Sequence, residues 1–481
     1  MGDPVRKHDG RSSPALVVMC LLAAASAGGW SGGAPAGPGA AGPGQATEPG
    51  GRSNAAAGQK PAAVESGRLA NEERAIVDYI DAHNDEAAAL LERVASINSG
   101  TMNLAGVREV GGIFRRELDA LGFTTRWEEG AEFRRAGHLI GERAGRGPRL
   151  LLIGHLDTVF EPDSPFQRFE RLGGGEARGP GVIDMKGGDV ILVQALKALL
   201  STGVLDRMSV TVVMTGDEER PGEPIPAARR SLIEAARGAD FAIGFEDGDG
   251  KPDHAVIARR GSSSWTLRVT GTPAHSSQIF TPESGDGAVF EAARVLNKFR
   301  ERMAGERYLT FSPGLVLGGT TVDLEPSLSR GTAFGKGNVI AGHAVAEGDL
   351  RTVSPEQLER AKRTMREIAA RHLPGTASEI TFEDDYPPMA PTEGNRRLLR
   401  LYDRVSRDLG FGPVTATDPA DAGAADISFA AGRVAMALDG IGLKGRGGHT
   451  VEETADLKML PVQTKRAAVL LHRLAGSGET P

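Results

Sequence analysis

The stretch LLIGHLDTVF, residues 151–160, joins a short apolar run to two chemically active side chains. Residues 151–153 are consecutive apolar residues, which is typical of a strand buried on both faces of a sheet. Gly154 ends this run, and His155 and Asp157 follow two residues apart. A buried strand that ends on an imidazole and a carboxylate indicates a functional site at its carboxyl end.

Apolar strands and helices alternate on either side of this stretch, and this alternation predicts an α/β domain whose mixed sheet is flanked by helices. The C-terminal part of the chain adds the strand VAMAL and a last helix near 458–475. The other predicted helices are 70–97, 104–121, 186–201 and 225–237, and the other predicted strands are 149–153, 208–215 and 240–245.

The pattern changes after about residue 258, where WTLRVTG alternates with a period of two residues. The segments that follow have the order β-α-β-β-α-β, which predicts a ferredoxin-like unit with helices on one face of an antiparallel sheet. We therefore expect one α/β domain in two parts, residues 70–257 and 389–481, with an inserted domain at 258–388. The predicted elements of the insertion are strands near 265–271, 309–319, 339–352 and 377–385, and helices at 286–303 and 354–373.

The N-terminus has the features of a secretory signal peptide, residues 1–27. Basic residues precede an apolar run at 14–24, which is too short to span a bilayer as a stable helix, and residues 25–27 (ASA) fit a cleavage site. An uncleaved anchor is the alternative. Residues 28–69 begin as a Gly-, Ala- and Pro-rich stretch and predict a disordered tether. We expect a secreted or periplasmic protein with no stable membrane span after cleavage.

The composition sets further bounds on the function. The 481 residues are 40% hydrophobic and 25% charged, as in ordinary soluble globular proteins. The formal net charge of −7 argues against a general nucleic-acid-binding protein, which needs a basic face. Cleavage after residue 27 would remove the single cysteine, Cys20, and a chain without thiols suits an oxidising compartment.

Acidic and imidazole residues follow several predicted strands of the α/β domain. Ligands of open α/β sheets gather at the carboxyl ends of the strands, so we expect these residues to converge. Clustered carboxylates repel one another unless protons or cations neutralise them. Two histidines with several carboxylates and no cysteine can bind Zn²⁺ or a similar ion, and two ions that share a carboxylate lie about 3.5–4 Å apart. The segments are HLD (155–157), Asp184, DEE (217–219), Glu246 with Asp247, and His449.

Each residue also has a simpler interpretation. Asp184 and Asp217 could be helix caps. His155 could be a hydrogen-bonded core histidine, residues 218–219 a solvated charge pair, and His449 a surface residue. The joint pattern favours the metal site.

Six short segments, GHLDTV, GPGVIDMKGG, TGDEERPG, GFEDG, GTPAHSS and GGHT, occur in this order across some 400 residues. In these segments the chain resembles the M20 family of zinc exopeptidases and amidohydrolases. The resemblance implies that His155 and Glu246 bind one zinc ion. It implies that Glu219 and His449 bind the other and that Asp184 bridges both. Mn²⁺ or Co²⁺ could occupy the same ligands.

The resemblance also assigns roles beside the metals. Asp157 would hydrogen-bond the far nitrogen of His155 and so fix its orientation. Glu218 would act as the general base and pass a proton to the leaving nitrogen. His275 would reach the site of a partner subunit and stabilise the oxyanion, and Asn338 and Arg351 would bind the carboxylate of the substrate. For Arg351 a surface arginine at the end of a strand is an equal alternative.

Three segments depart from the family pattern. Ala341 stands where the family often has proline, and the stretch AGAADIS keeps Asp426 but has alanines before it where the family often has Gly-Thr. The segment DDYPPMAP lacks an arginine that some carboxypeptidases of the family carry. These departures affect the expected specificity and leave the metal site intact.

The resemblance implies a hydrolase that cleaves a peptide or amide bond in a small peptide or N-acyl amino acid with a free carboxylate. Carboxypeptidase or dipeptidase action is favoured over N-acyl amino acid deacylase or desuccinylase action, because the biosynthetic deacylases act in the cytosol. The inserted domain implies a homodimer. The alternative from another class is a non-catalytic binding homologue, which should have lost metal ligands.

Overall fold

The computed structural model describes residues 69–325 and 330–476. The predicted signal peptide, residues 1–27, and all but the last residue of the predicted tether, 28–69, lie outside the described residues. In the described ranges, no helix has both the length and the apolar character needed to cross a membrane.

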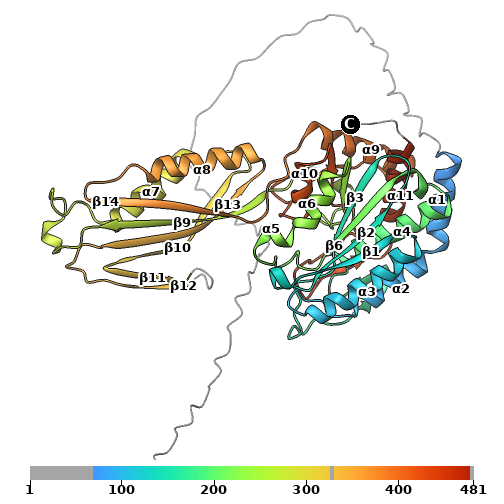
Figure 1. Ribbon diagram of the computed structural model, residues 1–481, viewed down its shortest axis with the longest axis horizontal. Helices are drawn as coiled ribbons and strands as arrows, with labels where there is room; N and C mark the ends of the chain where they lie inside the picture. Colours follow the sequence, from blue (N-terminus) through green and yellow to red (C-terminus); the bar gives the residue numbers. More distant parts are fainter. Residues whose placement is uncertain (1–68, 326–329, 477–481) are drawn as a thin grey trace, which may run out of the picture. The chain divides into compact units, whose positions relative to one another are not determined.

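A six-stranded mixed sheet forms the centre of the part of the molecule that contains residue 155 (Figure 1). Four strands of this sheet run parallel, and two antiparallel strands form one edge. In spatial order the strands are β1 (Thr124–Glu129), β2 (Gly137–Arg143), β6 (Ser209–Thr215), β3 (Arg149–His155), β7 (Phe241–Gly244) and β16 (Met436–Leu438).

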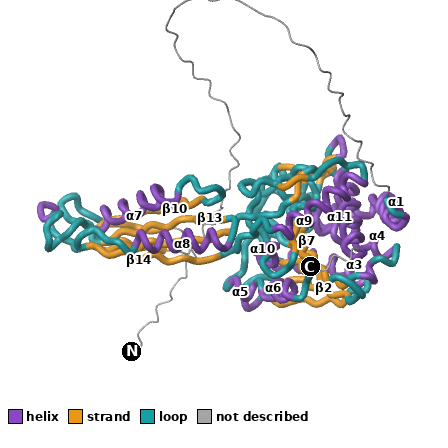
Figure 2. Tube along the Cα trace, turned by 90° about the horizontal axis from the view of Figure 1, so that it is seen from above, coloured by secondary structure: helices purple, strands orange, loops and turns teal. Residues whose placement is uncertain are grey.

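Helices cover both faces of this sheet, as the continuous apolar run in β3 predicts (Figures 1 and 2). Leu150 and Leu152 pack into the larger hydrophobic cluster on one face, and Leu151 and Ile153 pack into a second cluster on the other. The larger cluster includes residues of α1 (Asn71–Ala82), α2 (Asn84–Ala95), α3 (Leu104–Ala120), α4 (Lys186–Ser201), α9 (Glu393–Asp408) and α11 (Met459–Gly476). The second includes residues of α6 (Arg230–Arg237) and α10 (Ile427–Ala431).

Two predicted helices are each divided in the structure. The helix predicted at 70–97 is α1 followed by α2, because His83 leaves the helical conformation (φ −115°, ψ 15°) and its ring stacks on Tyr79. The helix predicted at 225–237 is α5 (Ile225–Ala228) followed by α6, and the break is at Arg229, whose side chain is fully buried. Apolar spacing continues through both breaks, so periodicity could not show them. Strands β1 and β2 were not predicted from the sequence.

A second sheet, four-stranded and antiparallel, lies between residues 261 and 384. In spatial order its strands are β10 (Thr310–Gly319), β13 (His343–Thr352), β9 (Gly261–Gly271) and β14 (Thr376–Asp384). Helices α7 (Ala288–Met303) and α8 (Pro355–Ala369) pack on one face through a cluster that contains Trp265, Phe299 and Met365. The order β-α-β-β-α-β confirms the predicted ferredoxin-like unit and fold class. The structure adds β11 (Thr321–Glu325) and β12 (Arg330–Phe334) between β10 and β13.

Short strands hold the loops around the central sheet. A small sheet contains, in spatial order, β17 (Gly445–Arg446), β18 (Thr454–Asp456), β5 (Glu176–Arg178) and β4 (Glu170–Arg171), and β8 (His254–Ala255) pairs with β15 (Thr415–Ala416). Where the chain enters and leaves the second sheet, the backbones of Arg259 and Met389 exchange two hydrogen bonds of 3.0 Å. The boundaries proposed from the sequence, 257/258 and 388/389, fall beside this pair.

Candidate metal centre

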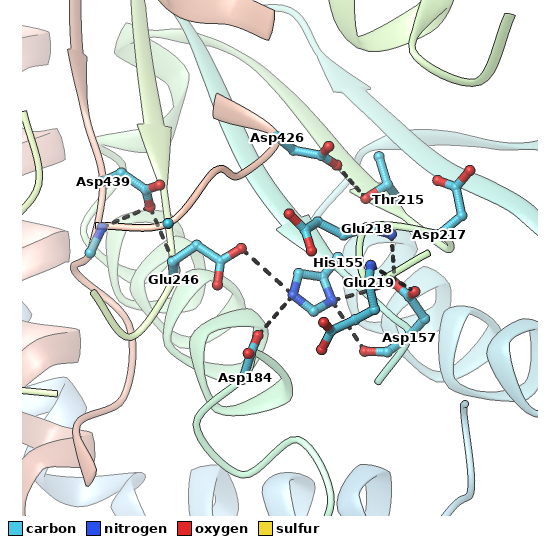
Figure 3. A network of polar contacts seen from close by, with 12 residues as sticks. His155, Asp157, Asp184, Thr215, Asp217, Glu218, Glu219, Glu246, Asp426 and Asp439 are labelled. Carbon is cyan, nitrogen blue, oxygen red and sulfur yellow. Dashed lines mark hydrogen bonds and ion pairs between the residues drawn. The ribbon is translucent and has the colours of Figure 1, made fainter. Parts of the chain in front are cut away.

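Five acidic and imidazole side chains meet at the carboxyl end of the parallel strands, in two groups that share Asp184. His155, Asp184 and Glu246 form one group, and the ligand atoms in each group lie within 4.8 Å of one another. The Nε2 atom of His155 lies 3.1 Å from Asp184 Oδ1 and 3.6 Å from Glu246 Oε1 (Figure 3). In the second group, His449 Nε2 lies 2.8 Å from Asp184 Oδ2 and 3.2 Å from Glu219 Oε2. The structure thus brings together all five residues predicted as ligands.

The register of the parallel strands explains why three of these side chains meet. His155 is the last residue of β3 and pairs with Thr215, the last residue of β6. β7 pairs with β3, and its last residue, Gly244, lies opposite Ile153, two residues before the end of β3. Glu219 and Glu246 lie in the loops that directly follow β6 and β7, so both loops leave the sheet beside His155. Loops at the carboxyl ends of parallel strands are the usual place for ligands in such sheets.

The other two side chains come from loops that Glu453 holds together. The buried Glu453 accepts hydrogen bonds through Oε1 from the backbone N–H groups of Ile183 (2.9 Å) and Asp184 (3.2 Å). Its Oε2 accepts a third from Gly181 (3.1 Å). His449 lies between β17 and β18, has a φ of +62°, and exposes 48% of its side chain. One carboxylate therefore fixes the loop of the shared Asp184 to the strand pair that carries His449.

Asp157 contacts both His155 and the loop after β6 (Figure 3). The Nδ1 atom of His155 lies 3.1 Å from the backbone carbonyl of Asp157 and 3.4 Å from its Oδ1 atom. The same carboxylate accepts hydrogen bonds from the backbone N–H groups of Glu218 (3.0 Å) and Glu219 (3.2 Å), and from the Thr101 hydroxyl (2.6 Å). Asp157 therefore lies beside the far nitrogen of His155, where its carbonyl is the nearer of two acceptors, and its predicted role in orienting His155 stays a prediction.

The clustered carboxyl groups are buried, and burial changes their pKa values. Burial raises the pKa values of Glu218 and Glu246 well above the usual value of a glutamate. It raises the pKa of Glu219 to about 7. Hydrogen bonds with Asp184 and Glu219 raise the pKa of His449 to about 12. Such a cluster holds protons unless another cation takes their place.

One buried oxygen atom is evidence that a cation binds in this cluster. Glu219 Oε1 is buried and has no hydrogen-bond partner among residues 69–325 and 330–476. A buried acceptor without a partner is costly, and a metal ion would satisfy it. Two imidazoles and three carboxylates, without a thiolate, are suitable donors for zinc and for similar divalent ions. The side chains therefore fit two divalent ions that share Asp184.

Glu218 lies beside the two groups and belongs to neither. Its backbone is fixed at both ends, because the N–H donates to Asp157 and the carbonyl accepts from the Tyr386 hydroxyl at 2.9 Å. Its carboxyl group makes no hydrogen bond or ion pair with any residue in the described part of the chain. Glu218 is thus held by its main chain and has a side chain that is free to exchange a proton.

A buried ionic network also contacts this loop, through Asp217. Arg229 donates to Asp217 Oδ1 (2.5 Å), to Asp426 Oδ1 (2.7 Å) and to the Tyr386 hydroxyl (2.9 Å). Asp426 also accepts from the Thr215 hydroxyl (2.6 Å). The sequence drew attention to Asp426 but gave no sign of Arg229 or Tyr386. In the letters AARRS, the buried Arg229 looks the same as its exposed neighbour.

The three residues predicted to contact substrate lie on the second sheet or in its loops, and in the described part of the chain they make no hydrogen bond or ion pair with the five clustered side chains. His275 is exposed and binds the Ser277 hydroxyl through Nδ1 at 2.8 Å. Asn338 lies beside it, because the N–H of Ser276 donates to the Asn338 carbonyl at 2.9 Å. Arg351 is half-buried near the far end of β13 and pairs with Asp349 at 2.8 Å. The structure places His275 near Asn338 and does not bring Arg351 to them.

Comparisons with known proteins agree with this geometry. The profile of the peptidase family M20/M25/M40 matches residues 151–473, so the chain belongs to this family. It is a hydrolase of the metallopeptidase and amidohydrolase class. Carboxypeptidase G2 of a Pseudomonas species is 26% identical over 83% of this chain and 92% of its own length. A succinyl-diaminopimelate desuccinylase of Gluconacetobacter diazotrophicus is 29% identical over 76% of this chain and 91% of its own.

Solved structures show the same fold. The aminopeptidase PepT of Bacillus cereus has a TM-score of 0.62 and 16% identity, covering 82% of this chain and 99% of its own. A dinuclear metal-binding M20 peptidase of Bacillus subtilis has a TM-score of 0.58 and 17% identity, with the same coverage of both chains.

Proposed function

We propose that this chain is a di-zinc hydrolase that cleaves a peptide or amide bond of a small peptide or N-acyl amino acid with a free carboxylate. The main support is the arrangement of two ligand groups around Asp184, with the unpaired carboxyl group of Glu218 beside them. When bound, two such ions polarise a carbonyl and make water a better nucleophile.

Residues of the chain supply orientation, proton transfer and substrate binding. Asp157 orients His155 and holds the peptide units of the Glu218 loop. Glu218 accepts a proton from the attacking water and delivers it to the leaving nitrogen, since no described partner occupies its carboxyl group. Arg351 binds the carboxylate of the substrate through its planar guanidinium, and His275 donates to the oxyanion.

The placement of these last residues supports a homodimer. Asn338 precedes β13, whereas Arg351 lies eight residues beyond the first residue of that strand, which is a distance of about 26 Å in extended chain. Asn338 and Arg351 of one chain therefore cannot bind the same carboxylate. Two copies of the chain could do so, if the inserted domain of each supplies His275 and Asn338 to the other. Exposed apolar side chains on this domain, Phe280, Val289, Phe290, Val316 and Phe334, offer a surface for such contact.

The substrate class rests on the relatives and on the N-terminus. Carboxypeptidase G2 and the desuccinylase represent the two activities that the sequence left open, the first being favoured. A secreted or periplasmic location, proposed from residues 1–27, favours carboxypeptidase or dipeptidase action over a biosynthetic desuccinylase. Deacylation of N-acyl amino acids is the second candidate, and the same ligand groups would serve it.

A substrate panel with a matched variant tests the proposal. We expect the zinc-loaded protein to hydrolyse C-terminal dipeptides or N-acyl amino acids, and product analysis separates these two activities. Glu218→Ala should retain two zinc ions and lose about 10²- to 10⁴-fold in kcat. Glu234→Ala, which alters an exposed glutamate on α6, serves as the control. If the wild type and Glu218→Ala both bind zinc and neither hydrolyses any substrate, the non-catalytic binding homologue is favoured.

A further inference from the structure

The peptide unit of Glu218 is held from two directions by side chains distant in sequence. The N–H donates to Asp157 Oδ1 at 3.0 Å, and the carbonyl accepts from the Tyr386 hydroxyl at 2.9 Å. The carboxyl group itself has no polar partner among the described residues. The direction of that side chain is therefore set by the main chain, and Tyr386 holds one of its two fixed points.

Tyr386 is itself held firmly in place. Its hydroxyl accepts a hydrogen bond from Arg229 Nη2 at 2.9 Å, which leaves the hydroxyl hydrogen for the Glu218 carbonyl. Its ring packs against Phe429, with 5.1 Å between the ring centroids, and only 8% of the residue is exposed. The buried Arg229 is fixed in turn by Asp217 and Asp426. A hydroxyl with a fixed donor on one side can hold its acceptor on the other.

The backbone of Tyr386 lies where the chain returns from the inserted sheet. Tyr386 follows β14 by two residues, and its carbonyl accepts from the N–H of Ser262, at the start of β9, at 2.8 Å. Its backbone therefore belongs to the connection with the second sheet, while its hydroxyl contacts the loop of the expected general base. No other tyrosine hydroxyl in the described residues contacts this loop.

We propose that Tyr386 is a positioning residue for Glu218, acting through the hydrogen bond from its hydroxyl to the Glu218 carbonyl. The proposal rests on the proposed function for the part that concerns catalysis. The competing explanation is that Tyr386 contributes only apolar packing beside Phe429 and Arg229. The two explanations differ in whether removal of the hydroxyl alone has an effect.

Three variants separate these explanations. Tyr386→Phe removes the hydroxyl and keeps the ring, Tyr386→Leu removes both, and Tyr402→Phe removes a buried hydroxyl on α9 as the control. We expect Tyr386→Phe to bind two zinc ions, to keep the KM and the Tm of the control, and to lose about 10-fold in kcat, the lower end of the effect of such supporting contacts. If Tyr386→Phe keeps the wild-type kcat and only Tyr386→Leu loses activity, the proposal is wrong and Tyr386 contributes packing alone.

Two further measurements tie the effect to Glu218. In a Glu218→Ala background, Tyr386→Phe should not lower the residual rate further, because residues that act as a unit are not additive. A full additional 10-fold loss would show that Tyr386 does not act through Glu218. In hydrogen exchange, Tyr386→Phe should speed exchange of the amides at 217–219 relative to Tyr402→Phe, and unchanged exchange would overturn the proposal.

The exchange measurement also distinguishes failure of the proposed function from failure of the positioning role of Tyr386. If the wild type hydrolyses nothing, the proposed function fails, yet faster exchange in Tyr386→Phe would still support the positioning contact. If the wild type is active and Glu218-dependent while kcat and exchange are unchanged in Tyr386→Phe, the positioning role is wrong and the proposed function stands.

Discussion

At the scale of single residues, Glu453 fixes the loop that carries Asp184, the predicted shared ligand. Its two oxygens accept from three backbone N–H groups, those of Gly181, Ile183 and Asp184. A neutral amide at this position would keep one acceptor oxygen and place an NH₂ group against a backbone donor. The loop would then have to shift or leave a buried N–H without a partner.

We therefore expect Glu453→Gln to weaken zinc binding by about 10- to 100-fold, as loss of supporting contacts does in other metal sites. Competition with a coloured chelator measures this affinity. Glu452→Gln, next along the chain and exposed, is the matched control. Equal zinc affinity in the two variants would contradict the role given to Glu453.

Glu72 gives a pH-dependent prediction far from the site. Its hydrogen bonds with Arg207 and His472 lower its pKa to about 2. A carboxyl group whose pKa falls on folding stabilises the native state above its unfolded pKa, and this stability is lost as the pH drops towards the folded pKa. The contribution is small, since 43% of the side chain is exposed.

Glu72→Gln should accordingly lower the free energy of unfolding slightly at pH 7, and this difference from the wild type should shrink below about pH 5. Urea unfolding at pH 7, 5 and 4 measures it. Glu109→Gln, which alters an exposed glutamate of α3, should show no comparable trend. A difference for Glu72→Gln that grows on acidification would exclude the stabilising role of this carboxylate.

At the scale of elements, the break between α5 and α6 coincides with a buried charge. Arg229 ends the first helix and is enclosed by Asp217 and Asp426, all three being almost completely buried. Replacing Arg229 by methionine leaves two buried carboxylates without their partner. Removing one member of a buried ion pair costs about 3–5 kcal/mol.

Arg229→Met should therefore lower the free energy of unfolding by about 3–5 kcal/mol in urea. Arg230→Met is the matched control, because the neighbouring Arg230 pairs with Glu132 and both side chains are about half exposed. That control should change stability little. Similar losses in the two variants would mean that the buried network does not stabilise this loop.

The same break shows what the sequence could and could not predict about elements. Helix α4 was predicted with its observed bounds, 186–201, because its apolar positions and loop signals agree. The division at Arg229 depends on Asp426, almost 200 residues away, and no local pattern contains that information. β1 was missed because its side chains are polar and partly exposed, so it lacks the apolar run that marks β3.

At the scale of the whole molecule, two sheets with separate hydrophobic clusters follow from two kinds of sequence pattern. Continuous apolar strands predicted the sheet that carries the candidate metal ligands, and the period of two after residue 258 predicted the antiparallel one. Strand ends and glycine-rich loops marked a set of acidic and imidazole candidates, and the resemblance to the family selected the five predicted ligands from that set. The residues that support them, such as Glu453 and Tyr386, could not, since only tertiary contacts distinguish them from other polar residues.

Removal of the metal should lower the stability of the folded protein. An ion that binds the native state alone stabilises it, by about 4 kcal/mol at a 1,000-fold excess over Kd. We expect a chelator to lower the Tm and added Zn²⁺ to restore it, with a zinc-saturated chelator as the control. An unchanged Tm after verified loss of zinc would contradict binding at a site that joins β3, β6 and β7.

The contacts of Asp157 have a consequence for how this enzyme family could lose its activity. One carboxylate contacts the ring of His155 and the amides of Glu218 and Glu219. We therefore expect a substitution at position 157 to impair zinc binding and catalysis together. A substitution of the Glu218 side chain alone should leave the predicted zinc ligands in place, so a zinc-binding homologue without activity is reached more directly through position 218.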